Sequence, residues 1–397
     1  MTVVVFPGVR SLRAGQGRGW AGSAQLATVA EWGCGLGADI ERLLCDPDPA
    51  VLDGWEDVAA VAYGLVVAEM MCQEPAHLVC GRGAGELAAL AAAGVLTPRT
   101  ALSLAARRAG ARRSGRARLT RVPLYGIHPE RITTCLGQSD QLWVRERNGP
   151  LESVIAGARK DLAIALRQLA SPSLRVGAAV PCRAGFHTPA ARETQRDLAV
   201  QIEQAALGEA KVAALSSVDG RVHVHPAAWR RQLEHGITAP LRWDLVLAAL
   251  ARTGGRRPSL IVVAGANTGL GSGLRQARPG SPVVHVSGPA DLAPFARRCG
   301  DGGDGEGERV DTTVRLIISD TTGVCWPAPP IAAGTRMVEG AVVAHVAGQA
   351  QHSRFAGTVR GWLALPGERV RTGQPLLWLD ADPAAAEDGT YSRDRCS

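Results

Sequence analysis

Short apolar runs alternate with helical patterns along residues 1–290. Val3–Phe6 is rich in β-branched residues and ends at Pro7-Gly8, so it predicts a buried strand followed by a turn. Val58–Gln73 predicts a buried helix, and Leu78–Cys80 predicts a second strand. Further strands are expected at 213–218, 260–263 and 282–286. This alternation indicates an α/β fold for a main domain that we place at residues 1–295.

The segment from about 120 to 182 changes this pattern and predicts an inserted subdomain. Its expected elements are, in order, strand 122–127, helix 129–136, strand 142–146, strand 153–156, helix 160–169 and strand 174–180. The order βαββαβ is that of a ferredoxin-like fold. The main domain then resumes with a long helix that opens at Phe186-His187-Thr188-Pro189.

A strand, a glycine-rich turn and an alanine-rich helix follow one another without interruption from Ala76 to Gly94. The strand runs into Gly81-Arg82-Gly83-Ala84-Gly85, and the helix begins at Glu86. This layout is that of a nucleophile elbow, in which the middle residue carries the nucleophile at the tip of a strained turn. Here the middle residue is Gly83, which has no side chain.

Other interpretations of the polar and glycine-rich residues carry less weight. A dinucleotide-binding loop requires glycine where Glu86 stands, and a carboxylate there would repel phosphate. Cys80 as a substitute nucleophile lies in the strand, where a buried cysteine is usually inert. His223 and His225 lack a third ligand, which favours a structural role over a metal site.

The last quarter of the chain predicts a separate all-β domain at residues 312–382. Residues 296–311 are a flexible linker by composition, and the polar tail 383–397 is expected to be disordered. Within the domain, Gly334–Val346 parallels Gly367–Leu379 at a constant offset of 33 residues. Two quasi-equivalent halves of short strands predict a flattened barrel with pseudo-twofold symmetry.

Charge and cysteine content narrow the class of protein. Lys and Arg total 44 against 37 Asp and Glu, which gives a net charge of +7. This charge suits acidic partners such as carrier proteins or CoA phosphates. A solvated Arg-rich surface explains the charge equally well. The nine cysteines form no CxxC pair, which fits a reducing cytoplasm and argues against a metal site. No stretch predicts a signal peptide, a membrane span or a nucleic-acid surface, so we expect a cytoplasmic protein without membrane or nucleic-acid partners.

Several motifs resemble the malonyl-CoA:acyl-carrier-protein transacylase family, the acyltransferases of fatty-acid and polyketide synthesis, over about residues 1–290. They are Val5–Gly8, Gly81–Glu86, Asn148, Ile155–Gly157, Phe186–Pro189, Ser217–Arg221, Pro240–Trp243 and, loosely, Gly265–Leu274. The resemblance implies an α/β-hydrolase-like acyltransferase core with a ferredoxin-like insert. It also implies a mechanism in which a His deprotonates a Ser, which takes the acyl group as an ester, with thiols of CoA and carrier protein as alternating partners.

The resemblance assigns roles to residues that this chain keeps. His187 lies in the segment of the family's catalytic His, and Arg108 falls where the family keeps an Arg that pairs with the malonyl carboxylate. Asn148 matches the family's small subdomain, and we expect it, like Val9, to belong to the substrate-binding site. For His187 and for Arg108, two interpretations each stay open. His187 is either a residual acid or base or a hydrogen-bonded relic, and Arg108 either binds a carboxylate or makes a structural ion pair.

Other positions depart from the family pattern at its chemical centre. Gly83 stands at the nucleophile position, Arg82 at the neighbouring His and Val9 at the Gln on the oxyanion side. The Gln expected shortly before Pro240 is missing as well. Loss of the nucleophile alone costs about 10⁶-fold in rate when the triad acts as a unit, so transfer through a seryl ester is not expected. Arg82 is either part of an anion site at the helix N-terminus or, as we prefer, an exposed side chain.

The C-terminal domain resembles biotinyl and lipoyl carrier domains, most clearly at Phe355–Val359 and Gly367–Leu376. A carrier domain of this kind needs a lysine at the hairpin between its halves, near residue 350. The sequence there is Ala347–His352, and no lysine follows Lys211 anywhere in the chain. Covalent attachment of biotin or lipoate to this domain is therefore not expected.

Three functional hypotheses follow from these patterns. The first is an acyltransferase-fold protein of polyketide or fatty-acid biosynthesis that binds malonyl-type acyl groups on CoA or acyl carrier protein, and hydrolyses, decarboxylates or gates them. The second is a non-catalytic scaffold, a pseudoenzyme that docks carrier protein, ketosynthase or acyl-CoA carboxylase subunits. The third is an active transferase that uses an unexpected nucleophile. Acyl-CoA is the only ligand that these hypotheses imply, and whether the chain is an enzyme stays open.

Overall fold

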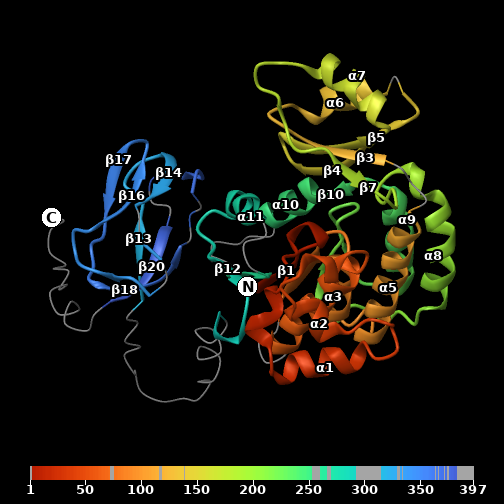
Figure 1. Ribbon diagram of the computed structural model, residues 1–397, viewed down its shortest axis with the longest axis horizontal. Coiled ribbons are helices and arrows are strands. Elements are labelled where there is room, and N and C mark those ends of the chain that lie inside the picture. The colour runs from red at the N-terminus through yellow and green to blue at the C-terminus, as the bar shows by residue number, and fades with distance from the viewer. Residues whose placement is uncertain are drawn as a thin grey trace, which may run out of the picture. The chain divides into compact units, whose positions relative to one another are not determined.

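The chain divides into two compact units, Met1–Asp301 and Gly302–Ser397 (Figure 1). The computed structural model describes residues 2–71, 76–115, 119–137, 139–252, 260–265, 270–291, 314–328, 331–332, 334–362, 364, 366–370, 372 and 375–381. The expected linker, 296–311, and the expected disordered tail, 383–397, lie outside the described residues. Within the described part, no helix is long and apolar enough to cross a membrane.

The first unit is built on a six-stranded sheet of order β12-β11-β1-β2-β8-β9. Its strands are β1 (Thr2–Phe6), β2 (Leu78–Gly81), β8 (Ala213–Leu215), β9 (Val222–His223), β11 (Leu260–Ala264) and β12 (Val283–Val286). All neighbours pair in parallel except β9, which runs antiparallel to β8. The predicted α/β class is confirmed. The strand expected at 213–218 is shorter, because the chain turns at Ser216, whose N–H donates to the carbonyl of Arg221.

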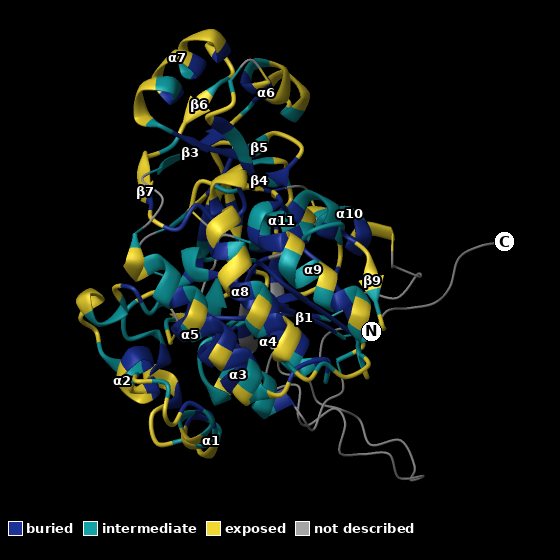
Figure 2. Cartoon of the chain, turned by 90° about the vertical axis from the view of Figure 1, so that its right-hand side faces the viewer, coloured by how far each residue is buried: buried dark blue, intermediate teal, exposed yellow. Residues whose placement is uncertain are grey.

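Alternate side chains of β1 point to opposite faces of the sheet, as strand geometry requires. Val4 and Phe6 join the larger apolar cluster, whereas Val3 and Val5 join the smaller one. The larger cluster is packed by α1 (Ala24–Trp32), α2 (Ile40–Cys45), α3 (Glu56–Met70), α4 (Gly85–Ala92), α5 (Pro98–Ser114), α8 (Arg192–Gln204) and α9 (Pro226–Thr238). The smaller cluster is packed by α10 (Trp243–Arg252) and α11 (Gly271–Ala277). Figure 2 shows buried residues along the central strands and exposed residues on the outward faces of the helices.

The short 3₁₀ helices of this unit are η1 (Val9–Ser11), η2 (Gln16–Trp20), η3 (Pro49–Leu52), η5 (Pro189–Ala191) and η6 (Pro289–Asp291). Two of them matter for the site, because η1 follows β1 directly and η5 follows His187. The long helix expected from Phe186 therefore begins with a 3₁₀ turn and continues as α8.

The turn between β2 and α4 needs its glycines. A Cβ at Gly85 would lie 2.2 Å from the carbonyl oxygen of Phe6, and one at Gly81 would lie 2.3 Å from the backbone of Glu86. Neither approach is tolerable, so β1, β2 and α4 meet this closely only with glycine at both positions. The next helix, α5, is started by Thr97, whose hydroxyl accepts a hydrogen bond from Thr100 N–H at 3.1 Å.

The inserted subdomain follows the expected order of elements. Its parts are β3 (Leu119–Tyr125), α6 (Pro129–Leu136), β4 (Leu142–Gly149), β5 (Glu152–Gly157), α7 (Arg159–Leu169), β6 (Arg175–Val176) and β7 (Val180–Cys182). The sheet order is β10-β4-β5-β3-β6, with β7 also paired to β3, and α6 and α7 lie on one face (Figure 1).

Two details of this sheet differ from the prediction. The single strand expected at 174–180 is two short strands, because Gly177 lies against the ring of Pro123 and donates its N–H to the carbonyl of Pro123 at 2.8 Å. The additional strand β10 (Leu241–Arg242) pairs in parallel with β4 and so joins the core to the subdomain.

The C-terminal unit consists of two four-stranded sheets around one apolar cluster. Their orders are β13-β20-β18-β15 and β17-β16-β14-β19. The strands are β13 (Val314–Ile318), β14 (Gly323–Pro327), β15 (Arg336–Met337), β16 (Val342–Val346), β17 (Gln349–His352), β18 (Gly357–Trp362), β19 (Arg369–Val370) and β20 (Pro375–Ala381). In the 33-residue repeat, β15 corresponds in sequence to β19, and the first residue of β16 corresponds to the first residue of β20. Since the paired strands occupy matching places in different sheets, the unit has the expected pseudo-twofold arrangement.

Candidate functional site

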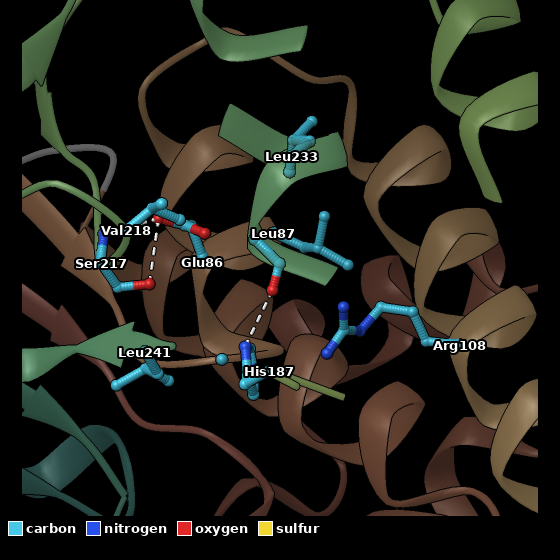
Figure 3. Close-up of a pocket in the computed structure, with 10 residues that line it drawn as sticks. Glu86, Leu87, Arg108, His187, Ser217, Val218, Leu233 and Leu241 are labelled. Carbon is cyan, nitrogen blue, oxygen red and sulfur yellow. Dashed lines mark hydrogen bonds between the residues drawn. The ribbon is translucent and has the colours of Figure 1, made fainter. Parts of the chain in front are cut away.

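A small pocket lies beside the β2–α4 turn and has a volume of about 20 Å³. We call it the Gly83 pocket (Figure 3). Its lining residues are Gly83, Glu86, Leu87, Arg108, His187, Ser217, Val218, Leu233, Gly236 and Leu241. Three of the residues singled out from the sequence, Gly83, Arg108 and His187, therefore meet in one place.

The backbone at Gly83 keeps the geometry of an elbow that carries a side chain. Its φ is +58°, in the left-handed region that only glycine adopts freely. A Cβ built at Gly83 would lie 3.8 Å from His187 Nε2 and 3.7 Å from Leu241 Cδ1. Both distances are ordinary van der Waals contacts, so the pocket has space for a side chain that would face the imidazole.

His187 is held in one orientation and one tautomer. Its Nδ1 lies 2.9 Å from the carbonyl oxygen of Gly236, and because a carbonyl only accepts, Nδ1 carries the proton. Nε2 is then the free acceptor on the side of Gly83. The residue has φ +66°, a conformation that is uncommon for a non-glycine residue and that clusters at functional sites.

The position four residues before Pro240 is Gly236, in the segment where the resemblance leads one to expect a Gln. Because its backbone carbonyl orients His187, this contact needs no particular side chain. Burial lowers the pKa of His187 well below its ordinary value, and Arg145, Arg108 and Arg112 lower it further. The imidazole is therefore neutral at physiological pH.

Arg108 makes a structural ion pair and also faces the pocket. Its Nε lies 3.2 Å from Asp57 Oδ1, and its guanidinium stacks on Phe186 at 4.2 Å from the ring centroid. Its Nη2 is buried and has no hydrogen-bond partner. In Figure 3 the guanidinium points into the pocket toward the side where His187 lies. The two interpretations of this residue are thus compatible, because the ion pair uses only part of the guanidinium.

Asp57 is fully buried and pairs with Arg112 as well as with Arg108. Burial alone would raise the pKa of Asp57, but Arg112 and Arg108 outweigh it and hold the pKa below its ordinary value. The two guanidinium groups share this one carboxylate, so while Glu86 in the same pocket is protonated they leave a surplus of positive charge there. This surplus favours an anionic ligand.

Glu86 was used in the sequence analysis as the end of the elbow motif and as an argument against a phosphate loop, without a role in the site, yet it lines the pocket. Its Oε1 accepts hydrogen bonds from Ser217 N at 2.8 Å and from Ser217 Oγ at 3.2 Å. Burial raises the pKa of the carboxyl to about 7, although the bonds from Ser217 oppose this shift. The sequence carries one signal for this role, because Glu86 is an acid at the start of an otherwise apolar helix.

Arg82 is not exposed, so the preferred interpretation of this residue is wrong. Its side chain is buried, and its Nη2 donates to Glu146 and, at 2.8 Å, to Asn148 Oδ1. Burial lowers its pKa to about 10. The partners belong to β4 of the inserted subdomain, 64 and 66 residues away along the chain, and cover Arg82 from outside the elbow.

Val9 and Asn148 do not line the Gly83 pocket. Val9 opens η1 and packs against the larger apolar cluster. Asn148 accepts from Arg82 and donates to Glu152 Oε1 at 3.0 Å, so its amide is used within the protein. Neither residue is among those that line the pocket.

The remaining chemically interesting residues have structural partners. Burial raises the pKa of Cys80 to about 12, which leaves its thiol protonated and inert. His223 Nε2 lies 2.9 Å from Asp219 Oδ2. Among the described residues, no group of three or more His, Cys, Asp or Glu side chains is arranged to hold a metal ion.

The hairpin at the centre of the C-terminal repeat joins β16 to β17. Its two turn residues are Ala347, with φ +52°, and Gly348, with φ +79°. Positive φ at both central positions is the signature of a tight two-residue hairpin. The tip thus presents a methyl group and a hydrogen, where a carrier domain would present a lysine.

The larger unit is similar in sequence and structure to known transacylases. The chain is 28% identical over 285 residues to the malonyl CoA-acyl carrier protein transacylase of Mycobacterium tuberculosis, a match that covers 68% of this chain and 90% of the relative. The corresponding Haemophilus influenzae protein is 26% identical over 211 residues, which is 49% of this chain and 64% of that protein. No known protein-family profile matches the chain.

Solved structures of transacylases have the same fold. The Mycobacterium tuberculosis enzyme superposes with a TM-score of 0.65 at 26% identity and covers 75% of this chain and 99% of its own. The malonyl CoA-acyl carrier protein transacylase of Coxiella burnetii superposes with a TM-score of 0.69 at 17% identity and covers 75% and 98%. These superpositions leave about a quarter of this chain unmatched.

Proposed function

We propose that this chain, which has the fold of the malonyl-CoA:acyl-carrier-protein transacylases and resembles them in sequence, binds malonyl-type acyl groups carried on CoA or acyl carrier protein. The observation that carries the proposal is the buried, unpartnered Nη2 of Arg108 in the Gly83 pocket. A buried donor without a partner costs about 1–3 kcal/mol, and a carboxylate at this point would recover that cost.

The charge of the site supports a carboxylated acyl group over a neutral one. Arg108 and Arg112 share the carboxylate of Asp57, and the carboxyl that lines the pocket itself, Glu86, has its pKa raised by burial to about 7. The guanidinium charge is therefore balanced least when Glu86 is protonated. A guanidinium fork matches a carboxylate in geometry as well as in charge. The acyl chain must be short, because the pocket is narrow and its apolar wall is formed by leucine side chains such as Leu233 and Leu241.

The same pocket argues against transfer through a covalent seryl ester. Gly83 offers no hydroxyl beside His187, and Cys80 is a protonated, fully buried thiol. The proposed function is therefore recognition of the acyl thioester without formation of an acyl-enzyme.

Calorimetric titration of the full chain with malonyl-CoA and with acetyl-CoA tests the proposal. We expect malonyl-CoA to bind about 10- to 100-fold more tightly, the equivalent of one charge-assisted hydrogen-bond pair. Arg108→Ala removes this preference, whereas Arg107→Ala, an exposed residue on the same helix, leaves it intact. Equal affinity of the wild type for the two thioesters would rule out carboxylate recognition by Arg108.

A second candidate function is the scaffold, because both units lack the reactive side chain that their resemblances lead one to expect. Gly83 replaces the nucleophile, and the β16–β17 hairpin has no lysine. In this case the chain binds acyl carrier protein, a ketosynthase or an acyl-CoA carboxylase subunit through its surface. Carrier-protein binding that Arg108→Ala and His187→Ala leave unchanged, without any affinity for malonyl-CoA, would favour the scaffold.

A further inference from the structure

We infer that the Gly83 pocket is a hydrolytic site, in which a water molecule between Gly83 and His187 attacks the thioester of the bound acyl group. The inference rests on the proposed function, since it requires that the thioester bind there. It assigns a reaction to the pocket in place of transfer.

The room for a water molecule beside His187 exists because Gly83 has no side chain. A Cβ at Gly83 would be in contact with His187 Nε2 at 3.8 Å, so with glycine the volume beside the imidazole is open. The pocket measures about 20 Å³, and a cavity needs about 10–15 Å³ of such volume to hold one water molecule. A water also needs two to four polar partners, and Glu86, Arg108, His187 and Ser217 all line the pocket.

The base is already set for proton abstraction. Gly236 accepts from His187 Nδ1, so Nε2 carries a lone pair toward the position of the missing side chain. A water at hydrogen-bond distance from Nε2 takes the place that a nucleophilic hydroxyl would occupy. Burial and the nearby arginines lower the pKa of His187, so the imidazole is neutral and offers its Nε2 lone pair to the water, but as a weaker base than an exposed histidine.

The reaction is balanced without a co-reactant. His187 Nε2 takes one proton from the water while the water oxygen forms a bond to the thioester carbonyl carbon. The tetrahedral intermediate collapses, the carbon–sulfur bond breaks, and the thiolate leaves. The proton on Nε2 is delivered to the thiolate, which gives the free thiol of CoA or carrier protein and restores neutral His187. The new carboxyl group keeps the second proton of the water and releases it to solvent, which leaves malonate.

The acyl group needs more room than one water occupies. The pocket of about 20 Å³ is smaller than a malonyl group, so we expect side chains of its apolar wall, among them Leu233 and Leu241, to move when the acyl group enters. The carboxylate then lies at Arg108, and the thioester carbonyl lies beside Gly83. This arrangement leaves the small volume next to His187 to the water.

The test uses the full chain with malonyl-CoA in water enriched in oxygen-18. We expect one heavy oxygen in the malonate that is released, a stoichiometric amount of free CoA, and no change in the intact mass of the protein. Gly83→Ala fills the volume of the water and should lower the rate at least tenfold while the affinity for malonyl-CoA changes less than about threefold.

Two further variants keep the test sharp. Gly22→Ala is the matched control, because Gly22 has φ +75° and open space around its Cβ, so it imposes similar backbone strain without filling a pocket. His187→Asn removes the base but suits the left-handed conformation, and it should lower the rate about 100-fold or more. Circular dichroism melting confirms that each variant is folded.

The outcomes separate the inference from the proposed function. Tight binding of malonyl-CoA without release of malonate would overturn hydrolysis and leave recognition standing. Acetyl-CoA and carbon dioxide as products would show decarboxylation, and a malonyl adduct on Ser217 would show a substitute nucleophile; each would overturn the inference. No binding of malonyl-CoA would overturn the proposed function itself.

Discussion

At the scale of single residues, the site brings a histidine and an arginine together beside a glycine. His187 and Arg108 are oriented by Gly236 and Asp57, and both reach a pocket whose centre is Gly83. A buried Glu86 in the same pocket is the residue whose ionisation changes near neutral pH. The charge that an anionic acyl group meets therefore depends on pH.

Glu86→Gln makes this titration measurable as stability. The pKa of Glu86 is about 7 in the folded protein and 4.5 ordinarily, so between these values the folded state holds the proton more tightly. The free energy of unfolding of the wild type consequently falls by about 3 kcal/mol as the pH rises through this window. Glu86→Gln lacks this contribution. The free energy of unfolding of the variant relative to that of the wild type therefore rises as the pH increases toward 7.

Urea unfolding of both proteins at several pH values measures the difference. Glu31→Gln, an exposed carboxyl with a side chain 75% accessible, is the control and should follow the wild type. A difference between Glu86→Gln and the wild type that stays constant with pH would show that Glu86 ionises normally.

At the scale of elements, the site depends on contacts between segments that are distant in the chain. Asp57 on α3 holds Arg108 and Arg112 of α5, and Glu146 on β4 holds Arg82 of the elbow. The elements themselves were largely predictable, because apolar periodicity and caps such as Thr97-Pro98 are local. The partners of the arginines were not, because 51 residues separate Arg108 from Asp57 and no local pattern marks the pair.

Asp57→Asn tests the α3–α5 contact. Removing one partner of a buried ion cluster leaves uncompensated charge and costs about 3–5 kcal/mol. We expect this loss in the free energy of unfolding, measured by urea denaturation. Asp53→Asn is the matched control, since its pair with Arg183 is exposed and such pairs contribute at most about 1 kcal/mol. Equal losses in the two variants would contradict the role of the buried cluster.

At the scale of the whole molecule, the larger unit has the fold of known transacylases, and Gly83 lies at the tip of its β2–α4 turn. The two matching four-stranded sheets of the C-terminal unit were predictable, because its halves repeat in sequence. The burial of Arg82 was not, because it depends on how the inserted subdomain covers the elbow. The function proposed for the chain is accordingly binding of an acyl thioester without a covalent step.

Intact-mass analysis of the wild type and Gly83→Ser, each incubated with malonyl-CoA, tests this claim most directly. A serine at this position places its side chain beside His187 Nε2, where the Cβ lies at 3.8 Å. We predict a malonyl adduct on Gly83→Ser and none on the wild type, with Gly22→Ser as the control for backbone strain. A malonyl adduct on the wild type would contradict the account.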